Sequence, residues 1–147
     1  MSPEIQTEGE FAGWSYWPGD KFEYDTVGPF YYRKDDAGEP VCAFRAEPRH
    51  MNGLGHMHGG CMMSFADFSL FAIADDVLDE ESSAVTVTLN SEFIGGAEVG
   101  DLMEARGEII RAGRSIIFIR GILTANGEPC LNYSGTIKKT RRRTPTS

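Results

Sequence analysis

The stretch from residue 56 to residue 74, HMHGGCMMSFADFSLFAIA, decides how the rest of the chain is interpreted. It opens with histidines and glycines and then becomes almost wholly apolar, except for the carboxylate of Asp67. Apolar residues on every side of a helix indicate a buried helix. A buried carboxylate is costly unless it is paired, hydrogen-bonded or protonated. Asp67 therefore either shares a narrow exposed stripe with Ser64 or lines a cavity where a reactive carboxylate with a raised pKa is needed.

The segments around this helix favour antiparallel strands. Residues 84–93 and 103–109 alternate apolar and polar side chains, and residues 116–123 are apolar on both faces, which predicts a central strand. Further strands are expected at 30–33, 41–46 and 130–138, with Asn126-Gly127 as a hairpin turn. The helix is expected to end near Asp75. The fold class is α+β, with an antiparallel sheet wrapped on one buried helix.

The length of 147 residues suits one globular domain. We expect an aromatic-rich N-terminal flap at 1–28, the main domain at 29–140 and a basic tail at 141–147. Hydrophobic residues make up 41% and charged residues 24% of the chain, which is ordinary for a soluble protein. No apolar run reaches the roughly 18 residues of a membrane span, and the acidic start MSPEIQTEGE does not resemble a secretory signal. These features predict a cytoplasmic protein without a membrane partner.

Charge is distributed unevenly along the chain. The net charge is −8, yet residues 1–137 hold all 22 acidic residues and only 9 of the 14 basic ones. An acidic body argues against nucleic acid as a partner. The basic residues at 138–143 form either a solvated end or an attraction for a phosphorylated ligand. The three cysteines lack C-x-x-C spacing, which favours buried thiols in a reducing compartment.

The start of the helix is a candidate site for an oxyanion. If the helix begins at Gly59 or Gly60, its free N–H groups form a positive, donor-rich end that a substrate oxygen can approach closely. Gly59 and Asp67 are eight positions apart, about 12 Å along one helix. Reacting atoms must come within about 3–3.5 Å of each other. One helix therefore cannot supply both groups to one reaction, whereas two antiparallel helices across a two-fold axis can, so their cooperation requires at least a homodimer.

Two competing chemistries fit the sequence less well. His50, His56 and His58 lack a nearby carboxylate or thiolate that would complete a zinc signature, so no metal is expected. The HGG element also occurs in the oxyanion loops of α/β-hydrolases, but the chain has no Gly-x-Ser-x-Gly element and no parallel sheet pattern.

Residues 50–60, HMNGLGHMHGG, followed by Asp67, resemble the hotdog-fold acyl-CoA thioesterases of the phenylacetate-degradation type, within the 4-hydroxybenzoyl-CoA thioesterase-like superfamily. The resemblance covers roughly residues 28–140. It implies the hotdog fold, a curved antiparallel β-sheet wrapped around one long central helix. It also implies a homodimer, often paired into a homotetramer, with sites at the dimer interface and an acyl-CoA substrate. No cofactor is implied, because coenzyme A is part of the substrate.

The resemblance also implies residue roles. Asp67 would be the general base or the nucleophile, and the Gly59 N–H would polarise the thioester carbonyl. Asn52 and His58 would orient the water, the leaving group and the loop. Thr86 would help to hold the water. Four further residues are candidates for substrate contacts: Gly60, Phe68, Arg49 and Arg114.

The expected activity is hydrolysis of acyl-CoA thioesters. The alternative is a non-catalytic acyl-CoA binding or sensing domain on the same fold, and a hydratase of acyl thioesters ranks below both. The acyl group, the choice between dimer and tetramer, and the choice between base and nucleophile stay open.

Overall fold

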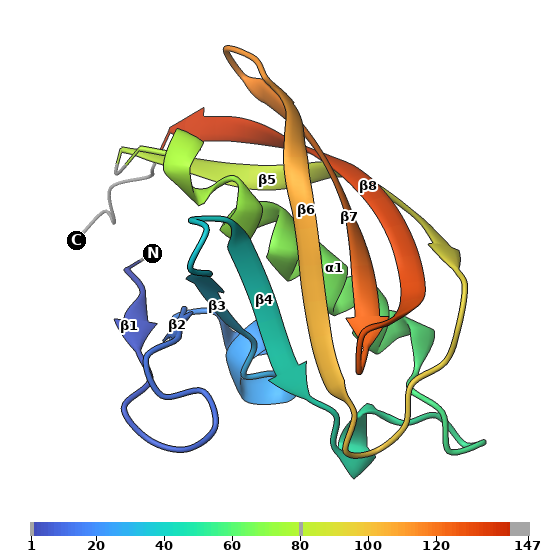
Figure 1. Cartoon of the computed structure of the whole chain (residues 1–147). Helices are drawn as coiled ribbons and strands as arrows, with labels where there is room; N and C mark the ends of the chain where they lie inside the picture. The colour runs from blue at the N-terminus through green and yellow to red at the C-terminus, as the bar shows by residue number, and fades with distance from the viewer. Residues whose placement is uncertain (1, 80, 142–147) are drawn as a thin grey trace.

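A computed structural model describes residues 2–79 and 81–141, in which eight strands form one antiparallel sheet that curves around the helix α1 (Figure 1). The strand order is β1-β2-β3-β4-β6-β7-β8-β5. The strands are β1 (Glu4–Ile5), β2 (Ser15–Tyr16), β3 (Tyr31–Lys34), β4 (Pro40–Arg45), β5 (Ser82–Phe93), β6 (Leu102–Ala112), β7 (Ile116–Ala125) and β8 (Glu128–Arg141), and the helices are η1 (Lys21–Thr26), η2 (Pro48–His50), α1 (Gly59–Ile73) and η3 (Asp75–Val77). The predicted α+β hotdog fold is confirmed.

Helix α1 starts at Gly59, one of the two starts considered from the sequence, and ends at Ile73, slightly before the expected end. His58 caps it, because its Nδ1 accepts a hydrogen bond of 2.8 Å from the Gly60 N–H. Most of the helix is buried in the concave face of the sheet. One stripe is only half buried and consists of Met63, Ser64, Asp67 and Phe71. Two side chains of this stripe, Met63 and Asp67, accept hydrogen bonds from Ser91 and Thr86 of strand β5.

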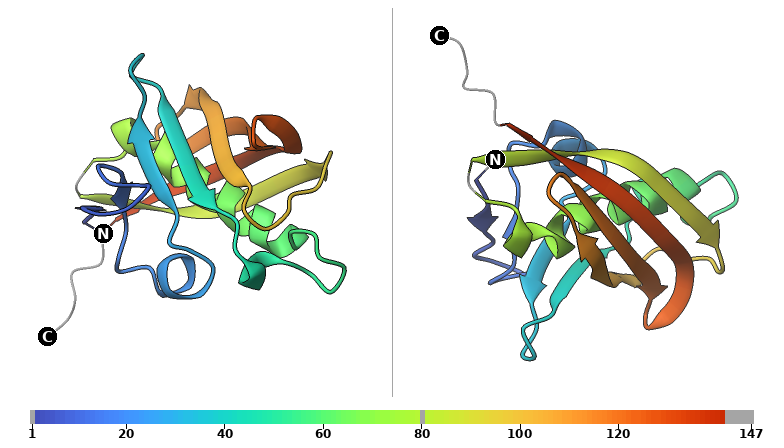
Figure 2. Two further views of the ribbon diagram at one scale, coloured as in Figure 1. Left: turned by 60° about the horizontal axis from the view of Figure 1, so that its bottom comes forward. Right: turned by 90° about the horizontal axis from the view of Figure 1, so that it is seen from above.

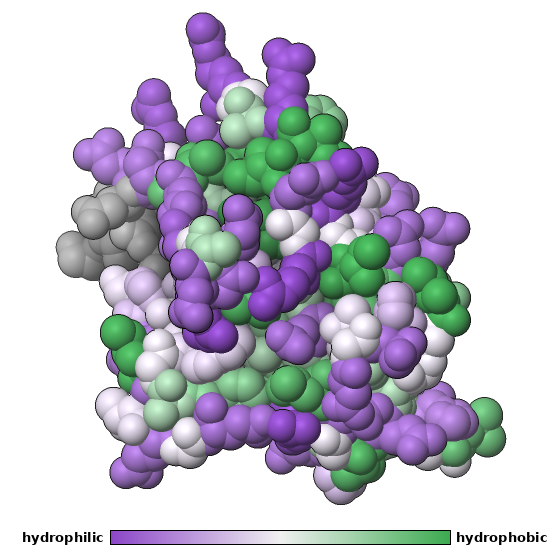
Figure 3. Space-filling view, viewed as in Figure 1, coloured by the Kyte–Doolittle hydropathy of each residue, from purple (hydrophilic) through white to green (hydrophobic). Residues whose placement is uncertain are grey.

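The expected strands are all present, and their ends lie a few residues from the predicted ones. Asn126 and Gly127 have positive φ angles of 50° and 86°, as a two-residue hairpin turn requires. Strand β7 lies between β6 and β8, so its prediction as a central strand is confirmed. Its outward side chains Phe118 and Ile122 are nevertheless 43% and 45% exposed. The face of the molecule seen in Figure 3 carries both hydrophobic and hydrophilic residues.

Strand β5 is the long edge strand of the sheet (Figure 2). It pairs with β8, and the register shifts between Thr86 and Thr88. Three of its apolar side chains, Val85, Val87 and Phe93, are 51%, 55% and 58% exposed. Although β5 alternates apolar and polar residues, these three apolar side chains therefore do not pack into the core of this chain.

The N-terminal segment is held firmly against the rest of the chain. β1 and β2 extend the sheet beyond β3, and the ring of Trp17 contacts those of Tyr32 at 4.5 Å and Phe68 at 5.1 Å between centroids. The expected boundary at residue 28 stays a prediction. Arg141 ends the described part of the C-terminus, so the predicted basic residues Arg142 and Arg143 lie outside the described residues.

None of the helices in residues 2–79 and 81–141 has the length and hydrophobicity needed to cross a bilayer.

Candidate active site

Asp67 and Thr86 come together across the gap between α1 and β5. The Thr86 hydroxyl donates a hydrogen bond of 2.5 Å to Oδ1 of Asp67. Partial burial raises the pKa of the Asp67 carboxyl, the hydrogen bond from Thr86 opposes that rise, and the charge of Asp20 adds to it. Asp67 is thus a half-buried carboxylate with one oxygen engaged by Thr86. This is the environment of a proton acceptor rather than that of a surface charge.

The helix N-terminus has one amide available. The Gly60 N–H donates to His58, and the N–H groups of Cys61 and Met62 donate to the carbonyl of His58. The Gly59 N–H donates to no group within the described residues. This free N–H at the positive end of α1 can bind the oxygen of a polarised carbonyl.

Phe93 from β5 closes one side of this helix end. A Cβ added to Gly59 would lie 3.0 Å and 3.1 Å from two carbons of its ring. Gly59 therefore allows a close approach between α1 and β5.

Asn52 shapes the loop before the helix. Its side-chain oxygen accepts hydrogen bonds from the N–H groups of Leu54 at 2.9 Å and His56 at 3.2 Å. The backbone of Met57 is tied to Ala97 at 2.8 Å. Asn52 thus has a structural role, and its predicted contact with water or a leaving group stays a prediction.

Arg49 and His50 anchor the N-terminal segment to this loop. The Arg49 guanidinium donates to the carbonyls of Thr26 and Gly28 and forms an ion pair of 2.8 Å with Glu47. Nδ1 of His50 accepts from the Glu47 N–H at 3.0 Å, so its Nε2–H donates to the Val27 carbonyl at 2.7 Å. The guanidinium predicted to bind substrate is already engaged within the chain.

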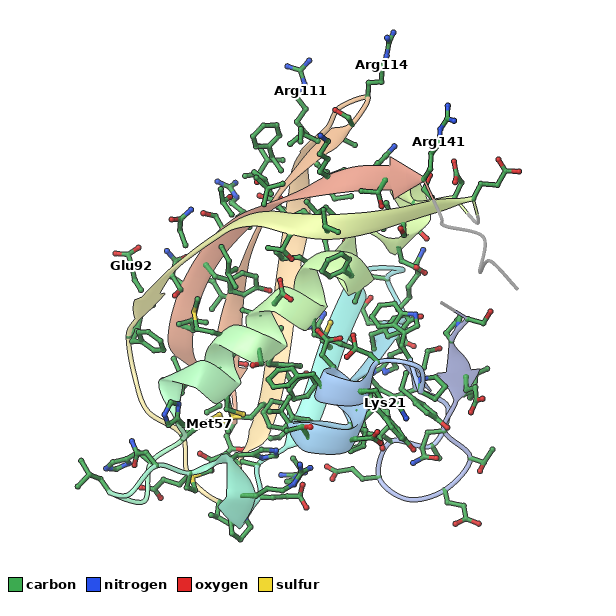
Figure 4. All side chains as sticks on the ribbon, turned by 180° about the vertical axis from the view of Figure 1, so that it is seen from behind. Lys21, Met57, Glu92, Arg111, Arg114 and Arg141 are labelled. Atoms are coloured by element: carbon green, nitrogen blue, oxygen red, sulfur yellow. The ribbon has the colours of Figure 1, made fainter. Side chains whose placement is uncertain are left out.

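Two other predicted substrate contacts lie away from the site in a single chain. Phe68 is only 2% exposed and packs among aromatic rings of the core. Arg114 lies beyond β6, at the end of the molecule opposite Met57 and the start of α1 (Figure 4). A role for Arg114 in substrate binding would therefore need a second copy of the chain.

A cavity of about 340 Å³ opens beside the helix N-terminus. Its walls come from η1, from the loop before α1 and from the first turns of α1, and its lining residues are Phe22, Thr26, Val27, Arg49, His50, Met51, His58, Gly60, Cys61 and Ser64. Ser64 is three residues before Asp67, so the cavity leads from the helix end towards the carboxylate.

Two acidic side chains of the N-terminal segment lie near this carboxylate. Asp20 caps η1 by accepting from the Glu23 N–H at 3.0 Å. Burial, the charge of Asp20 and the charge of Asp67 together raise the pKa of Glu23 to about 8. Glu23 has no recognisable signal in the sequence, because residues 1–28 carry no periodic pattern that would place it against α1.

Gly59 and Asp67 of the same chain do not converge, because eight helical residues separate them by about 12 Å. Within the described residues, no three His, Cys, Asp or Glu side chains are grouped to hold a metal ion.

Comparison with known proteins gives a consistent result. A family model described as the thioesterase superfamily matches residues 54–130. A Pseudomonas aeruginosa protein named "Putative esterase PA0474" is 33% identical over 111 residues, which is 76% of this chain and 83% of that protein. Mouse acyl-coenzyme A thioesterase 13 is 26% identical over 57% of this chain, which spans only 59% of that relative.

Solved structures share the fold. One is a hypothetical thioesterase of Streptococcus pneumoniae, solved with coenzyme A, which superposes with a TM-score of 0.67 at 18% sequence identity. The superposition covers 78% of this chain and 91% of the Streptococcus pneumoniae chain.

Proposed function

The chain belongs to the thioesterase superfamily, and from this premise we propose that it hydrolyses acyl-coenzyme A thioesters to a free acid and coenzyme A. Within the superfamily, the motif at residues 50–60 favours the phenylacetate-degradation type. Two features of α1 support the proposal most strongly. Asp67 accepts a hydrogen bond from Thr86, and the first amide of the helix donates to no group within the described residues.

Asp67 acts as the general base in this proposal. One oxygen accepts from Thr86, which leaves the other to take a proton from water. The water oxygen then bonds to the carbonyl carbon of the thioester. Partial burial supports this role, because it makes the carboxylate more basic than an exposed one.

Gly59 supplies the electrophilic group. Its N–H donates to the carbonyl oxygen, and the hydrogen bond strengthens as negative charge develops there. Collapse of the tetrahedral intermediate breaks the C–S bond, and the electron pair leaves with sulfur as the thiolate of coenzyme A. The proton taken up by Asp67 is returned to this thiolate or to solvent. A thiol with an ordinary pKa of about 8.5 leaves readily.

A second copy of the chain completes the site. We propose that two β5 strands pair edge to edge, because β5 is a twelve-residue edge strand with exposed apolar side chains. The exposed residues Val85, Val87 and Phe93 would then be covered by the partner. The Gly59 end of one helix would meet Asp67 of the other, and pairing of dimers would give the tetramer.

Release of free thiol from a panel of acyl-coenzyme A thioesters tests the proposal. The wild type should turn over at least one thioester, and Asp67→Asn should lower kcat by about 10²-fold or more, as loss of a general base does. Asp75→Asn, the same chemical change beyond the other end of α1, is the matched control and should keep activity. Tight binding of acyl-coenzyme A without any turnover would instead support a binding or sensing domain.

A further inference from the structure

We propose that the cavity between η1 and α1 is the acyl pocket of this protein and that it selects uncharged, apolar acyl groups. The inference rests on the proposed function and adds its substrate class. It assigns a role to the N-terminal segment, which lies outside the part of the chain that the family model matches.

The cavity lies where the acyl group of a bound thioester would extend. His58 and Gly60, on either side of Gly59, both line it. A carbonyl oxygen held by the Gly59 N–H therefore has the mouth of the cavity beside it. The opposite wall is formed by Phe22 of η1 and by Val27, which follows η1. In Figure 4, η1 lies beside α1 near the label of Lys21.

The polar groups of the lining are largely satisfied within the chain. The Ser64 hydroxyl donates to the Gly60 carbonyl at 2.8 Å, and both ring nitrogens of His50 have backbone partners. The Arg49 guanidinium is held by two carbonyls and by Glu47. A polar acyl group would lose hydrogen bonds to water and find few partners here, whereas an apolar group loses nothing.

Charge around the cavity opposes anionic acyl groups. Asp67 and Asp20 lie close enough for their charges to act on each other, whereas Glu23, whose pKa burial and these charges raise to about 8, is mostly neutral at neutral pH. None of the three forms an ion pair with a cation within residues 2–79 and 81–141. A terminal carboxylate on the acyl chain would add a negative charge to this set in a partly buried place.

The wall formed by η1 is fixed in place. The carbonyls at its end, those of Thr26, Val27 and Gly28, are all held by Arg49 and His50. The pocket is therefore preformed, and its volume of about 340 Å³ lies at the small end of the usual range for ligand sites. This favours short and medium acyl chains or a single aromatic ring.

Calorimetry with non-hydrolysable analogues tests this without turnover. The probes are ketone analogues of acetyl-, hexanoyl- and succinyl-coenzyme A, in which a methylene group separates the sulfur from the carbonyl. The wild-type protein should bind the hexanoyl analogue about tenfold or more tightly than the succinyl analogue. Ser64→Phe, which fills the cavity, should reduce the preference for hexanoyl over acetyl by about tenfold.

Phe22→Ala should also reduce this preference, because it removes an aromatic ring from the apolar wall of the cavity. Phe118→Ala removes a similarly exposed ring from the outer face of the sheet and should leave the preference unchanged. Equal binding of the hexanoyl and succinyl analogues, or a preference unaffected by both cavity variants, would overturn the inference. Failure of the wild type to hydrolyse any thioester would refute the proposed function instead, because the binding preference is measured separately.

Discussion

The hydroxyl of Thr86 on β5 donates a 2.5 Å hydrogen bond to the carboxylate of Asp67 on α1. This bond fixes the orientation of the carboxylate and connects the central helix to the edge strand of the sheet. It also favours the ionised form of Asp67, in opposition to the burial that favours the neutral form. The reactivity of Asp67 therefore depends on a residue of the strand that we propose as the dimer interface.

Replacement of Thr86 should change the pH dependence of catalysis. Thr86→Val removes the hydrogen bond that lowers the pKa of Asp67, so this pKa should rise and the acidic limb of the kcat/KM profile should move to higher pH. Activity at neutral pH should fall by roughly 10- to 100-fold, since a hydrogen bond to a charged group is worth about 1.5–3 kcal/mol. Thr86→Ser keeps the hydroxyl and should restore both the limb and the rate. An unshifted limb in Thr86→Val would show that Asp67 is not the titrating base.

Two substitutions can separate the role of the Gly59 N–H as a donor from the role of the missing side chain, which makes room for Phe93. Proline is favoured at the first position of a helix, and the preceding His58 already has the extended backbone that proline requires. Gly59→Pro removes the donor and should lower kcat by about 10²–10³-fold. Gly59→Ala keeps the donor and presses only on the exposed ring of Phe93, which has room to shift, so it should cost a few-fold at most. Equal kcat values for the two variants would exclude the amide as the oxyanion donor.

Glu23 should make the protein less stable as pH rises. Its pKa in the folded state, about 8, is higher than its ordinary value of 4.5, so the folded state holds the proton more tightly than the unfolded state. The stabilisation of the folded state by the protonated Glu23 carboxyl is fully present below about pH 4.5 and is lost as pH rises towards 8. Urea unfolding at several pH values should show this decline, and Glu23→Gln should flatten it. Glu98→Gln, at an exposed position, should leave it unchanged.

The sequence was sufficient for the parts of the fold that depend on local pattern. A mostly apolar run predicted α1, and the HGG element placed its start at Gly59 or Gly60, of which the structure has Gly59. Asn126-Gly127 predicted the last hairpin, because both positions require positive φ. The proximity of Asp67 and Thr86 followed from resemblance to a family rather than from pattern, since 19 residues separate them in the chain.

The sequence was insufficient where contacts between distant residues decide the role of a side chain. Val85, Val87 and Phe93 have the pattern of a core-facing set, but β5 is an edge strand and exposes them. Arg49 was a candidate for substrate contact, yet its guanidinium donates to the carbonyl at the end of η1. Glu23 carries no local signal, since its environment is created by η1 lying on α1.

The buried contact between Ser69 and Tyr133 should contribute measurably to stability. Ser69 donates to the Ala66 carbonyl at 2.7 Å, so the Tyr133 hydroxyl donates to Ser69 at 2.5 Å, and both side chains are buried. Ser69→Ala leaves the tyrosine hydroxyl without its partner and should lower the free energy of unfolding by about 1–3 kcal/mol. Adding Tyr133→Phe should recover part of this loss. Ser134→Ala, on the exposed side of β8, should change stability by less than about 0.5 kcal/mol.

Complementation between two inactive variants tests whether one site uses two chains. Asp67→Asn lacks the base and Gly59→Pro lacks the donor, so homodimers of either variant have two defective sites. In a heterodimer, the site formed by Gly59 of one chain and Asp67 of the other is intact, while the second site lacks both groups. Random association gives about half heterodimers, each with one intact site out of two, so co-expression should restore about a quarter of wild-type activity. Mixtures carrying an additional Val87→Lys on β5 should recover less, because a charge on the edge strand opposes its pairing. If both groups acted within one chain, the Asp67→Asn and Gly59→Pro mixture would show only the sum of the two residual activities, and thiol release per chain would not rise on co-expression.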